Sequence, residues 1–359
     1  MVKKRSIPWP MVLRIVLCLV LLGWVFQAIF LSEGRNAYER QGLAWDSLNR
    51  AEQWKLAWHY GPPELWRNVC LIDPTAATWS LLFMGATIFL GTLRWRMVLR
   101  VHGINLSLGR AAEISLVAHF FNSFLLGSTG GDLMKAFYAA RETSNRKTEA
   151  VVTVLVDRLI GLLSMLLFAA VMMVPNWALL SGHRRLAALA GIVVIMLLGA
   201  LAVAGLSFWG GLSRRWPRAR IWLRRLPKGE LLERALEACR QFGQEPRFLA
   251  QAFALSTVLN VMCVLQIWVL ARGLNLTIAP VALSLIVPVI ICIAAMPVTP
   301  SGLGLRENIY VWMLAVPEIN IPATQALLLS LLAYAGSLFW SLVGGVVYLF
   351  FRATRTEET

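Results

Sequence analysis

The sequence has few charged residues and no long polar stretch. Charged side chains make up 15% of its 359 residues, whereas 58% are hydrophobic. Soluble domains carry about 25% charged residues, so the composition excludes an ordinary soluble fold and indicates a polytopic membrane protein. Because no polar block is long enough to fold separately, we expect one membrane domain over residues 1–359.

Cysteine and histidine are scarce as well. The five cysteines and four histidines form no Cys-x-x-Cys motif, and no Cys–His spacing suits zinc. We therefore expect neither disulfide nor metal chemistry, and no cofactor.

Acidic residues are too few to balance the basic ones, and the formal net charge is +15. Ten basic and four acidic residues lie in the single loop 210–247. Lys and Arg gather in cytoplasmic loops of membrane proteins. We therefore interpret 210–247 as a cytoplasmic loop facing anionic lipid, and not as a nucleic-acid site.

Six apolar runs are long enough to span a bilayer. The first follows Lys3, Lys4 and Arg5 and resembles a signal peptide, but its apolar core is long and no cleavage site follows, so we expect a retained span. Positive-inside counting predicts a multi-pass protein of the cytoplasmic (inner) cell membrane with both termini in the cytoplasm. The predicted spans are 10–31, 74–93, 150–174, 186–209, 248–270 and 321–351.

Two loops follow from these spans. Residues 32–73 are nearly neutral, as expected of an outer loop, and apolar residues recur at three- or four-residue steps from Ala44 to Trp58. We predict an amphipathic helix on the outer surface that stops at Pro62–Pro63. After the second span, Arg94, Arg96, Arg100 and Arg110 predict a cytoplasmic loop.

Two further apolar segments are interrupted. Ser115–Gly127 would span about 20 Å as a helix, less than a bilayer requires. Small and polar residues 127–132 follow, and then a second helical pattern over Leu133–Arg141. The other segment, 279–315, is broken at Met296–Glu307. We expect both to be re-entrant, with irregular backbone covered by protein or by a water-filled cavity.

The order of these segments repeats. Residues 10–174 give span, span, broken segment, span, and residues 186–351 repeat this order from the opposite side of the membrane. The sequence thus predicts an all-α polytopic membrane protein with about six full spans and two re-entrant segments, arranged as an inverted repeat. Interrupted segments at matching places indicate a transporter-type central site.

The first break combines groups that bind anions. Free N–H groups at a helix start bind anions, and the residues around them add hydroxyls and a positive charge. Asp132 is either an N-cap for Leu133–Arg141, a partner of Lys135, or a ligand for a cationic group. Asn122 either contacts a ligand or packs between helices. The candidates here are Asn122, Ser128, Thr129, Gly130, Gly131, Asp132 and Lys135.

Asp157 and Arg158 lie within the third span. Charges at this depth are expensive and indicate functional sites. Neighbouring helical residues point in different directions, so the two need not pair. Arg158 can extend to the surface, whereas Asp157 is too short to do so.

The second break ends in an Arg–Glu pair at a helix start. Prolines remove backbone donors there and glycines permit tight turns. The arginine either binds a phosphate at the positive end of the helix or pairs locally with the glutamate. The candidates are Pro297, Pro300, Gly302, Gly304, Arg306 and Glu307.

These motifs resemble the lysylphosphatidylglycerol synthetase transmembrane-region family, over roughly residues 75–350. The matching residues are Asn122, Gly130-Gly131-Asp132, Asp157-Arg158-Leu-Ile-Gly-Leu and Pro297–Glu307. The resemblance implies lipid translocation by a flippase-like standalone member. Asp157 stands where the family commonly has Glu, and Lys135 where it commonly has Arg. Both changes keep the charge but alter the reach of the side chain, so the resemblance leaves the lipid head group open.

Three functions are compatible with this sequence. The favoured one is a lipid translocator, not an enzyme, that moves a polar, phosphate-bearing lipid between leaflets. The second is a membrane transferase of lipid or envelope-glycan biosynthesis, although Glu39 and Asp46 do not form the paired acids that such enzymes need. The third is a non-catalytic scaffold with envelope-biosynthesis partner proteins.

Overall fold

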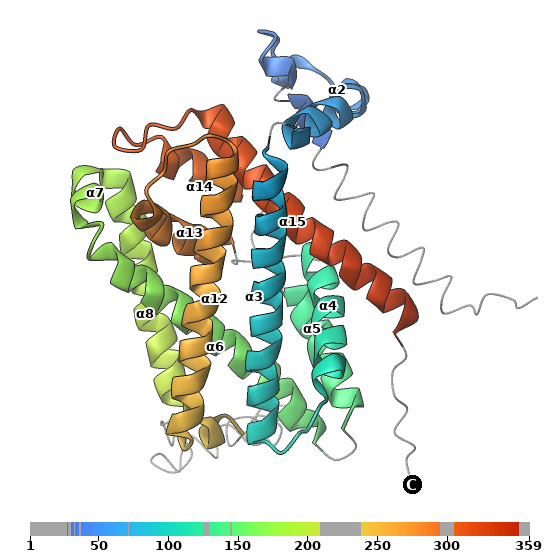
Figure 1. Ribbon diagram of the computed structural model, residues 1–359, viewed down its shortest axis with the longest axis vertical. Coiled ribbons are helices and arrows are strands. Elements are labelled where there is room, and N and C mark those ends of the chain that lie inside the picture. The colour runs from blue at the N-terminus through green and yellow to red at the C-terminus, as the bar shows by residue number, and fades with distance from the viewer. Residues whose placement is uncertain are drawn as a thin grey trace, which may run out of the picture.

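The computed structural model describes residues 27, 30–31, 33–35, 37–70, 72–124, 129–143, 146–208, 238–294 and 305–351. Over these ranges the chain is helical, and no strand occurs in them. Helical residues at 33–35 and 37–39 come before the short 3-10 helix η1 (Trp45–Ser47), and the elements after it are α-helices (Figure 1). These are α2 (Arg50–Cys70), α3 (Pro74–Val101), α4 (Leu108–Phe124), α5 (Thr129–Arg141), α6 (Lys147–Met173), α7 (Trp177–Gly182), α8 (Arg184–Phe208), α12 (Pro246–Gly273), α13 (Pro280–Ala294), α14 (Leu305–Leu314) and α15 (Ala323–Phe350).

Five of the described helices are long and apolar enough to cross a membrane: α3, α6, α8, α12 and α15. They coincide with the second to sixth predicted spans. The first predicted span, 10–31, lies almost wholly outside the described residues, as does most of the basic loop 210–247. The described part of the chain is therefore an all-helical fold with several candidate membrane spans.

Helix α3 is longer than predicted. Asp73 caps its start by accepting a 3.1 Å hydrogen bond from the N–H of Ala76, and Pro74 occupies the first turn. The helix continues past Leu93 to Val101, and Gly103 follows with a positive φ of 66°. The predicted loop of four arginines was therefore wrong: Arg94, Arg96 and Arg100 lie on α3, and Arg110 lies on α4. Arginine is a good helix former, and Arg94 and Arg96 have partners inside the protein.

The outer helix was also predicted with the wrong limits. Helix α2 begins at Arg50 and runs through Pro62 and Pro63 to Cys70. A proline pair costs hydrogen bonds within a helix, but packing stabilises this segment. A Cβ on Gly61 would lie 2.8 Å from Cα of Phe30, and the Phe30 and Trp58 rings meet edge to face at 5.0 Å.

Helices α4 and α5 form the first hairpin. Arm α4 begins at Leu108, earlier than the predicted Ser115, and its 17 residues measure about 25 Å. Gly131 lets the two arms touch, because a Cβ there would lie 2.0 Å from the carbonyl oxygen of Ala118. The open end is closed by Arg110 Nη2 and Glu142 Oε1, which lie 2.5 Å apart.

Helices α13 and α14 form the second hairpin. Residues 295–304 between them lie outside the described residues. Arm α14 begins at Leu305, so Arg306 and Glu307 lie in its first turn, as the sequence predicted.

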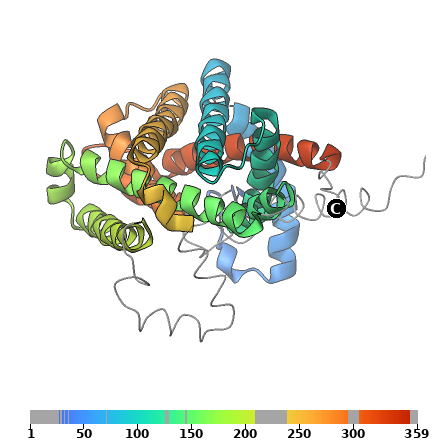
Figure 2. The same ribbon diagram turned by 90° about the horizontal axis from the view of Figure 1, so that it is seen from below.

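The two hairpins open toward opposite ends of the bundle (Figure 1). Helix α3 packs along α12, and the N–H of Asp73 donates to the carbonyl of Gly273 at 3.2 Å, so the two helices are antiparallel. Helix α15 crosses the bundle at an incline and packs on α4, while α6 packs on α13 (Figures 1 and 2). Gly344 permits the α15–α4 contact, since its Cβ would lie 2.1 Å from the carbonyl oxygen of Leu116.

Candidate functional site

A cavity of about 540 Å³ lies among these helices. Its volume falls in the range of small-ligand sites, about 300–1,000 Å³. Both hairpins and four of the long helices contribute to its wall, which combines apolar side chains with a set of charges and amides. The polar lining residues are Thr87, Arg94, His119, Asn122, Ser123, Asp132, Lys135, Asp157, Arg158, Asn260, Gln266, Arg306, Tyr310, Tyr334 and Ser337.

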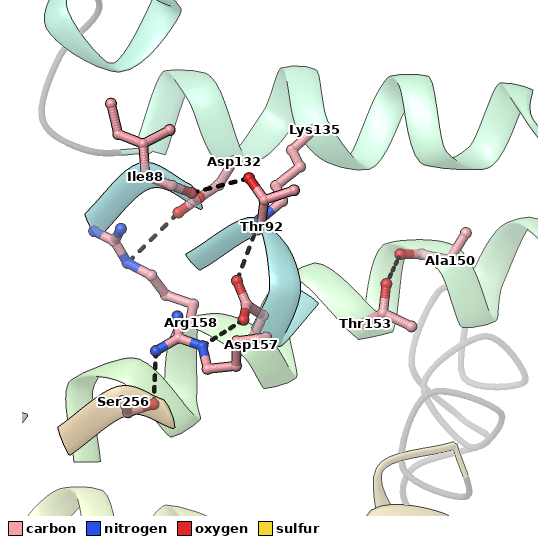
Figure 3. Close-up of polar contacts among 10 residues, drawn as sticks. Ile88, Thr92, Asp132, Lys135, Ala150, Thr153, Asp157, Arg158 and Ser256 are labelled. Atoms are coloured by element: carbon pink, nitrogen blue, oxygen red, sulfur yellow. Dashed lines mark hydrogen bonds and ion pairs between the residues drawn. The ribbon is translucent and has the colours of Figure 1, made fainter. Parts of the chain in front are cut away.

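Asp157 is the centre of an ionic cluster on one side of this cavity. Its Oδ1 accepts from Arg94 Nε at 2.7 Å, and its Oδ2 accepts from Lys135 Nζ at 3.2 Å. Arg94 also donates through Nη1 to Ser256 at 3.0 Å. Figure 3 shows Lys135 and Asp157 directed toward each other from separate helices. One carboxylate thus bridges two cations, which come from α3 and α5.

The three charges lie at one level of the bundle. Asp157 comes ten residues after the start of α6, about 15 Å along the axis, and Arg94 comes seven residues before the end of α3, about 10 Å. Their side chains are only 10–12% exposed, as is that of Lys135. The cluster therefore lies well inside the two candidate spans.

Neighbouring residues keep the two cations in place. Gly161 follows Asp157 by one helical turn on the same face. A Cβ on Gly161 would lie 2.9 Å from Nη2 of Arg94, so the glycine makes room for the guanidinium. Lys135 Nζ lies 4.4 Å from the ring centroid of the fully buried Trp95, a favourable cation–π distance. The need for space around the Arg94 guanidinium thus explains why a glycine, Gly161, ends the Asp-Arg-Leu-Ile-Gly motif.

The remaining charges of this motif form a second, looser pair. Arg158 Nε lies 3.5 Å from Oδ2 of Asp132 (Figure 3). The Arg158 side chain is 43% exposed, so this pair is less enclosed than the Asp157 cluster. Asp132 is the fourth residue of α5, so it is not the N-cap of a helix beginning at Leu133. Asp157 and Arg158 thus do not pair with each other, which the sequence left open, and each has its own partners.

Asn122 holds the tip of the first hairpin together. Its Oδ1 accepts from the N–H of Gly131 at 2.8 Å. Gly130 and Gly131 are both buried, and Thr129 is the first residue of α5. The amide therefore supports the hairpin, while Asn122 also lines the cavity. His119 likewise has a partner, the carbonyl oxygen of Ser337 at 3.2 Å.

The second hairpin brings Arg306 to the same cavity. Its Nη2 lies 2.5 Å from Glu307 Oε1, its Nε donates to Ser330 at 3.1 Å, and its Cζ lies 4.6 Å from the centroid of the Tyr334 ring. The local Arg–Glu pair considered from the sequence is therefore present, and Glu307 is buried. Five candidates lie outside the described residues: Ser128, Pro297, Pro300, Gly302 and Gly304.

Sequence reasoning missed Arg94 and the amides of α12. Arg94 was assigned to a loop because α3 was ended at Leu93. A helix that continues to the glycine at 103 contains Arg94 as a charge within an apolar segment. This is the same signal that identified Asp157. Asn260 and Gln266 are ordinary polar residues in a long span. Only the fold directs them to the cavity.

Metal binding has no support in the described part of the chain. Its His, Cys, Asp and Glu side chains form no group of three or more that could hold a metal ion.

Comparison with known proteins places the chain in a membrane-protein family. Residues 53–355 match the family model described as the lysylphosphatidylglycerol synthase TM region. A UPF0104 membrane protein of Methanothermobacter thermautotrophicus (strain Delta H) is 23% identical over 263 residues, covering 67% of this chain and 73% of that relative. The family match spans far more than half of the sequence and includes the cavity. The chain therefore belongs to the lysylphosphatidylglycerol synthase TM region family.

Proposed function

We propose that this protein is a flippase-like translocator that moves a polar, phosphate-bearing lipid between the two leaflets of a cytoplasmic membrane. The observation that carries the proposal is the single cavity to which both hairpins contribute charged side chains, Asp132 and Lys135 from one and Arg306 from the other. A head group in this cavity could contact both hairpins at once.

An inverted repeat supports the proposal. In such a repeat α3 of the first half corresponds to α12 of the second, α4 to α13, α5 to α14 and α6 to α15. The packing neighbours then map onto one another: α4 on α15 becomes α13 on α6, and α5 on α6 becomes α14 on α15. The half-repeats are residues 10–174 and 186–351. In transporters built this way the site lies between the repeats, and rocking of one half exposes it to alternate sides.

The charges of the cavity support a phosphate-bearing substrate. Three cationic side chains from the first half, Arg94, Lys135 and Arg158, line one wall. Cationic donors held in a partly dehydrated site bind phosphate oxygens by charge-assisted hydrogen bonds. The apolar lining of the same cavity is compatible with the glycerol backbone and upper acyl chains.

The proposal also includes an orientation in the membrane and a class of partner proteins. Both termini lie in the cytoplasm, and the basic loop 210–247 lies against anionic lipid. Helix α2 exposes Trp54, Trp58 and Trp66, which are 56%, 49% and 71% exposed. Tryptophans concentrate at membrane interfaces, so α2 lies on the opposite surface. Proteins of envelope biosynthesis are the proposed partners.

The test is a lipid inventory of a deletion strain, combined with leaflet-selective chemical labelling of head groups. A translocator leaves the total amount of its lipid unchanged and alters its distribution between leaflets. Wild-type protein should restore the distribution, and Lys135→Gln at equal abundance should not. Disappearance of one lipid altogether would instead identify a transferase. If neither the amount of any lipid nor its distribution between leaflets changes, both the translocator and the transferase are excluded, and the non-catalytic scaffold is the remaining function.

A further inference from the structure

The charges around the cavity do not balance. Arg94 and Lys135 share the one carboxylate of Asp157, with one cation on each oxygen. The other pairs are one to one: Arg158 with Asp132, and Arg306 with Glu307. The four described cations that line the cavity are therefore set against three acids, two in the lining and the third, Glu307, as the partner of Arg306. One positive charge is left over, and it belongs to the Arg94–Lys135 pair.

This extra charge lies where charge is expensive. The side chains of Arg94 and Lys135 are 11% and 12% exposed. An uncompensated charge in such surroundings is strongly destabilising unless a counter-ion or an aqueous cavity stabilises it. Both cations line the cavity. An anion entering the cavity would complete the charge balance of the cluster.

Both cations have hydrogen-bond donors to spare. Nε of Arg94 donates to Asp157 and Nη1 donates to Ser256, while Nη2 donates to no described residue. Of the three donors on Lys135, one is directed to Asp157. Gly161 and Trp95 hold the two groups in position before any ligand arrives. Such preorganisation strengthens binding, because less freedom is lost on association.

Neutral polar side chains also line the cavity, among apolar ones. Asn260, Gln266, Tyr310 and Ser337 supply amides and hydroxyls. Groups of this kind recognise hydroxyls. The described lining offers no uncompensated acid that would hold an ammonium group.

We infer that Arg94 and Lys135 form the phosphate subsite for a lipid of net charge −1, a phosphodiester whose remaining head group is uncharged and hydroxylated. Asp157 is the resident counter-ion, which the phosphate partly displaces from the two cations. The inference rests on the proposed translocation. It goes further by naming the head-group charge, a subsite residue, Arg94, that the sequence did not reveal, and a positioning residue, Gly161.

Binding of matched short-chain lipids to purified protein in detergent tests this. Dihexanoyl-phosphatidylglycerol carries one net negative charge, whereas dihexanoyl-phosphatidylethanolamine has the same phosphodiester and a compensating ammonium. Wild-type protein should bind the first at least about tenfold more tightly, since tenfold requires only about 1.4 kcal/mol of discrimination. Inorganic phosphate should bind more weakly than either, because it lacks acyl contacts.

Variants assign the effect to the cluster. Lys135→Gln removes the surplus charge and should reduce the preference to about twofold or less, whereas Lys135→Arg should keep it. Asp157→Asn raises the surplus to two charges and should tighten phosphatidylglycerol binding by at least about tenfold. Thermal unfolding of each variant shows whether it is folded. A folded Lys135→Gln that keeps the full preference would overturn the inference, as would equal binding of the two lipids by the wild type.

The remaining outcomes separate this inference from the proposed function. Inorganic phosphate that binds as tightly as phosphatidylglycerol would overturn the lipid as the ligand. Preferential binding without any change of leaflet distribution in cells would refute translocation and leave the subsite in place. Translocation without head-group preference would refute the subsite alone.

Discussion

The two hairpins occupy corresponding places in the chain but differ in how their charges are used. In the first, Asp132 and Lys135 reach across to Arg158 and Asp157 on α6. In the second, Arg306 pairs with its own neighbour Glu307 and with Ser330 on the following helix. The first hairpin thus depends on α3 and α6 for its charge balance, whereas the second is neutral by itself.

This difference implies separate roles. A hairpin whose ions are shared with other helices changes its energy whenever those helices move or a charged ligand enters. A locally neutral hairpin can move as a unit at little electrostatic cost. We therefore expect the first hairpin to sense the substrate and the second to act as the opposing wall. The predictions below test this contrast, beginning with the largest effect.

The tip of the first hairpin should tolerate no added atom. Gly131→Ala places a Cβ 2.0 Å from the carbonyl oxygen of Ala118 and 2.5 Å from the Asn122 amide. The clash is with backbone, so we expect about 3 kcal/mol of destabilisation, the upper end of overpacking costs. Thermal unfolding in detergent measures it. Gly109→Ala, on the same hairpin with no atom within 4 Å, is the control and should not destabilise. Equal unfolding of the two variants would contradict this packing.

Removing one acid from each hairpin's charge system should have unequal effects. Asp157→Asn leaves Arg94 and Lys135 without their shared carboxylate, so an anion should bind too tightly to leave, and transport should fall at least about tenfold. Glu307→Gln leaves Arg306 its contacts with Ser330 and Tyr334, so we expect less than about a threefold loss.

Leaflet distribution at matched protein abundance measures both. A larger loss in Glu307→Gln than in Asp157→Asn would reverse the roles of the hairpins. Degradation of Asp157→Asn would show that Asp157 serves mainly to hold the helices together.

The open ends of the hairpins should differ in stability as well. Arg110 and Glu142 close the first hairpin with side chains 17% and 11% exposed. Glu142→Gln should cost about 1.5–3 kcal/mol, typical of a hydrogen bond to a charged group. The exit of the second hairpin is tied to the start of α8 by His183 and Glu318, 2.6 Å apart, with Glu318 53% exposed. Glu318→Gln should lower the unfolding midpoint much less. A larger shift for Glu318→Gln would reverse this ranking.

The smallest predicted effect depends on pH. Hydrogen bonds from its own backbone N–H and from His183 hold the pKa of Glu318 below its usual value. A lowered pKa in the folded state stabilises the protein above the unfolded value, and this contribution is lost as the pH falls through the folded value. The small difference in unfolding midpoint between wild type and Glu318→Gln should therefore be constant at neutral pH and shrink as the pH falls below about 4, the usual pKa of a glutamate carboxyl. A difference that does not shrink in acid would mean that packing, not the carboxylate charge, causes it.

The long helices could be predicted because their signal is local. Five of the six predicted spans have limits that agree with the structure to within a few residues, apart from the end of α3, and the first lies almost wholly outside the described residues. The helix containing Arg306 and Glu307 was also predicted at its first turn. The limits of α2 were wrong because the helix continues through two prolines, in a stretch where Gly61 and Trp58 contact Phe30.

By itself the sequence determined the class of the protein, because hydrophobicity and helix length alone decide which segments can cross a bilayer. It also determined that charges lie inside the membrane region, at Asp157 and Arg158. Only the tertiary structure decided which charges meet. The contacts of Arg94 with Asp157, 63 residues away, and with Ser256, 162 residues away, join three helices. Such partners have no spacing rule in the chain, because they depend on where separate helices cross.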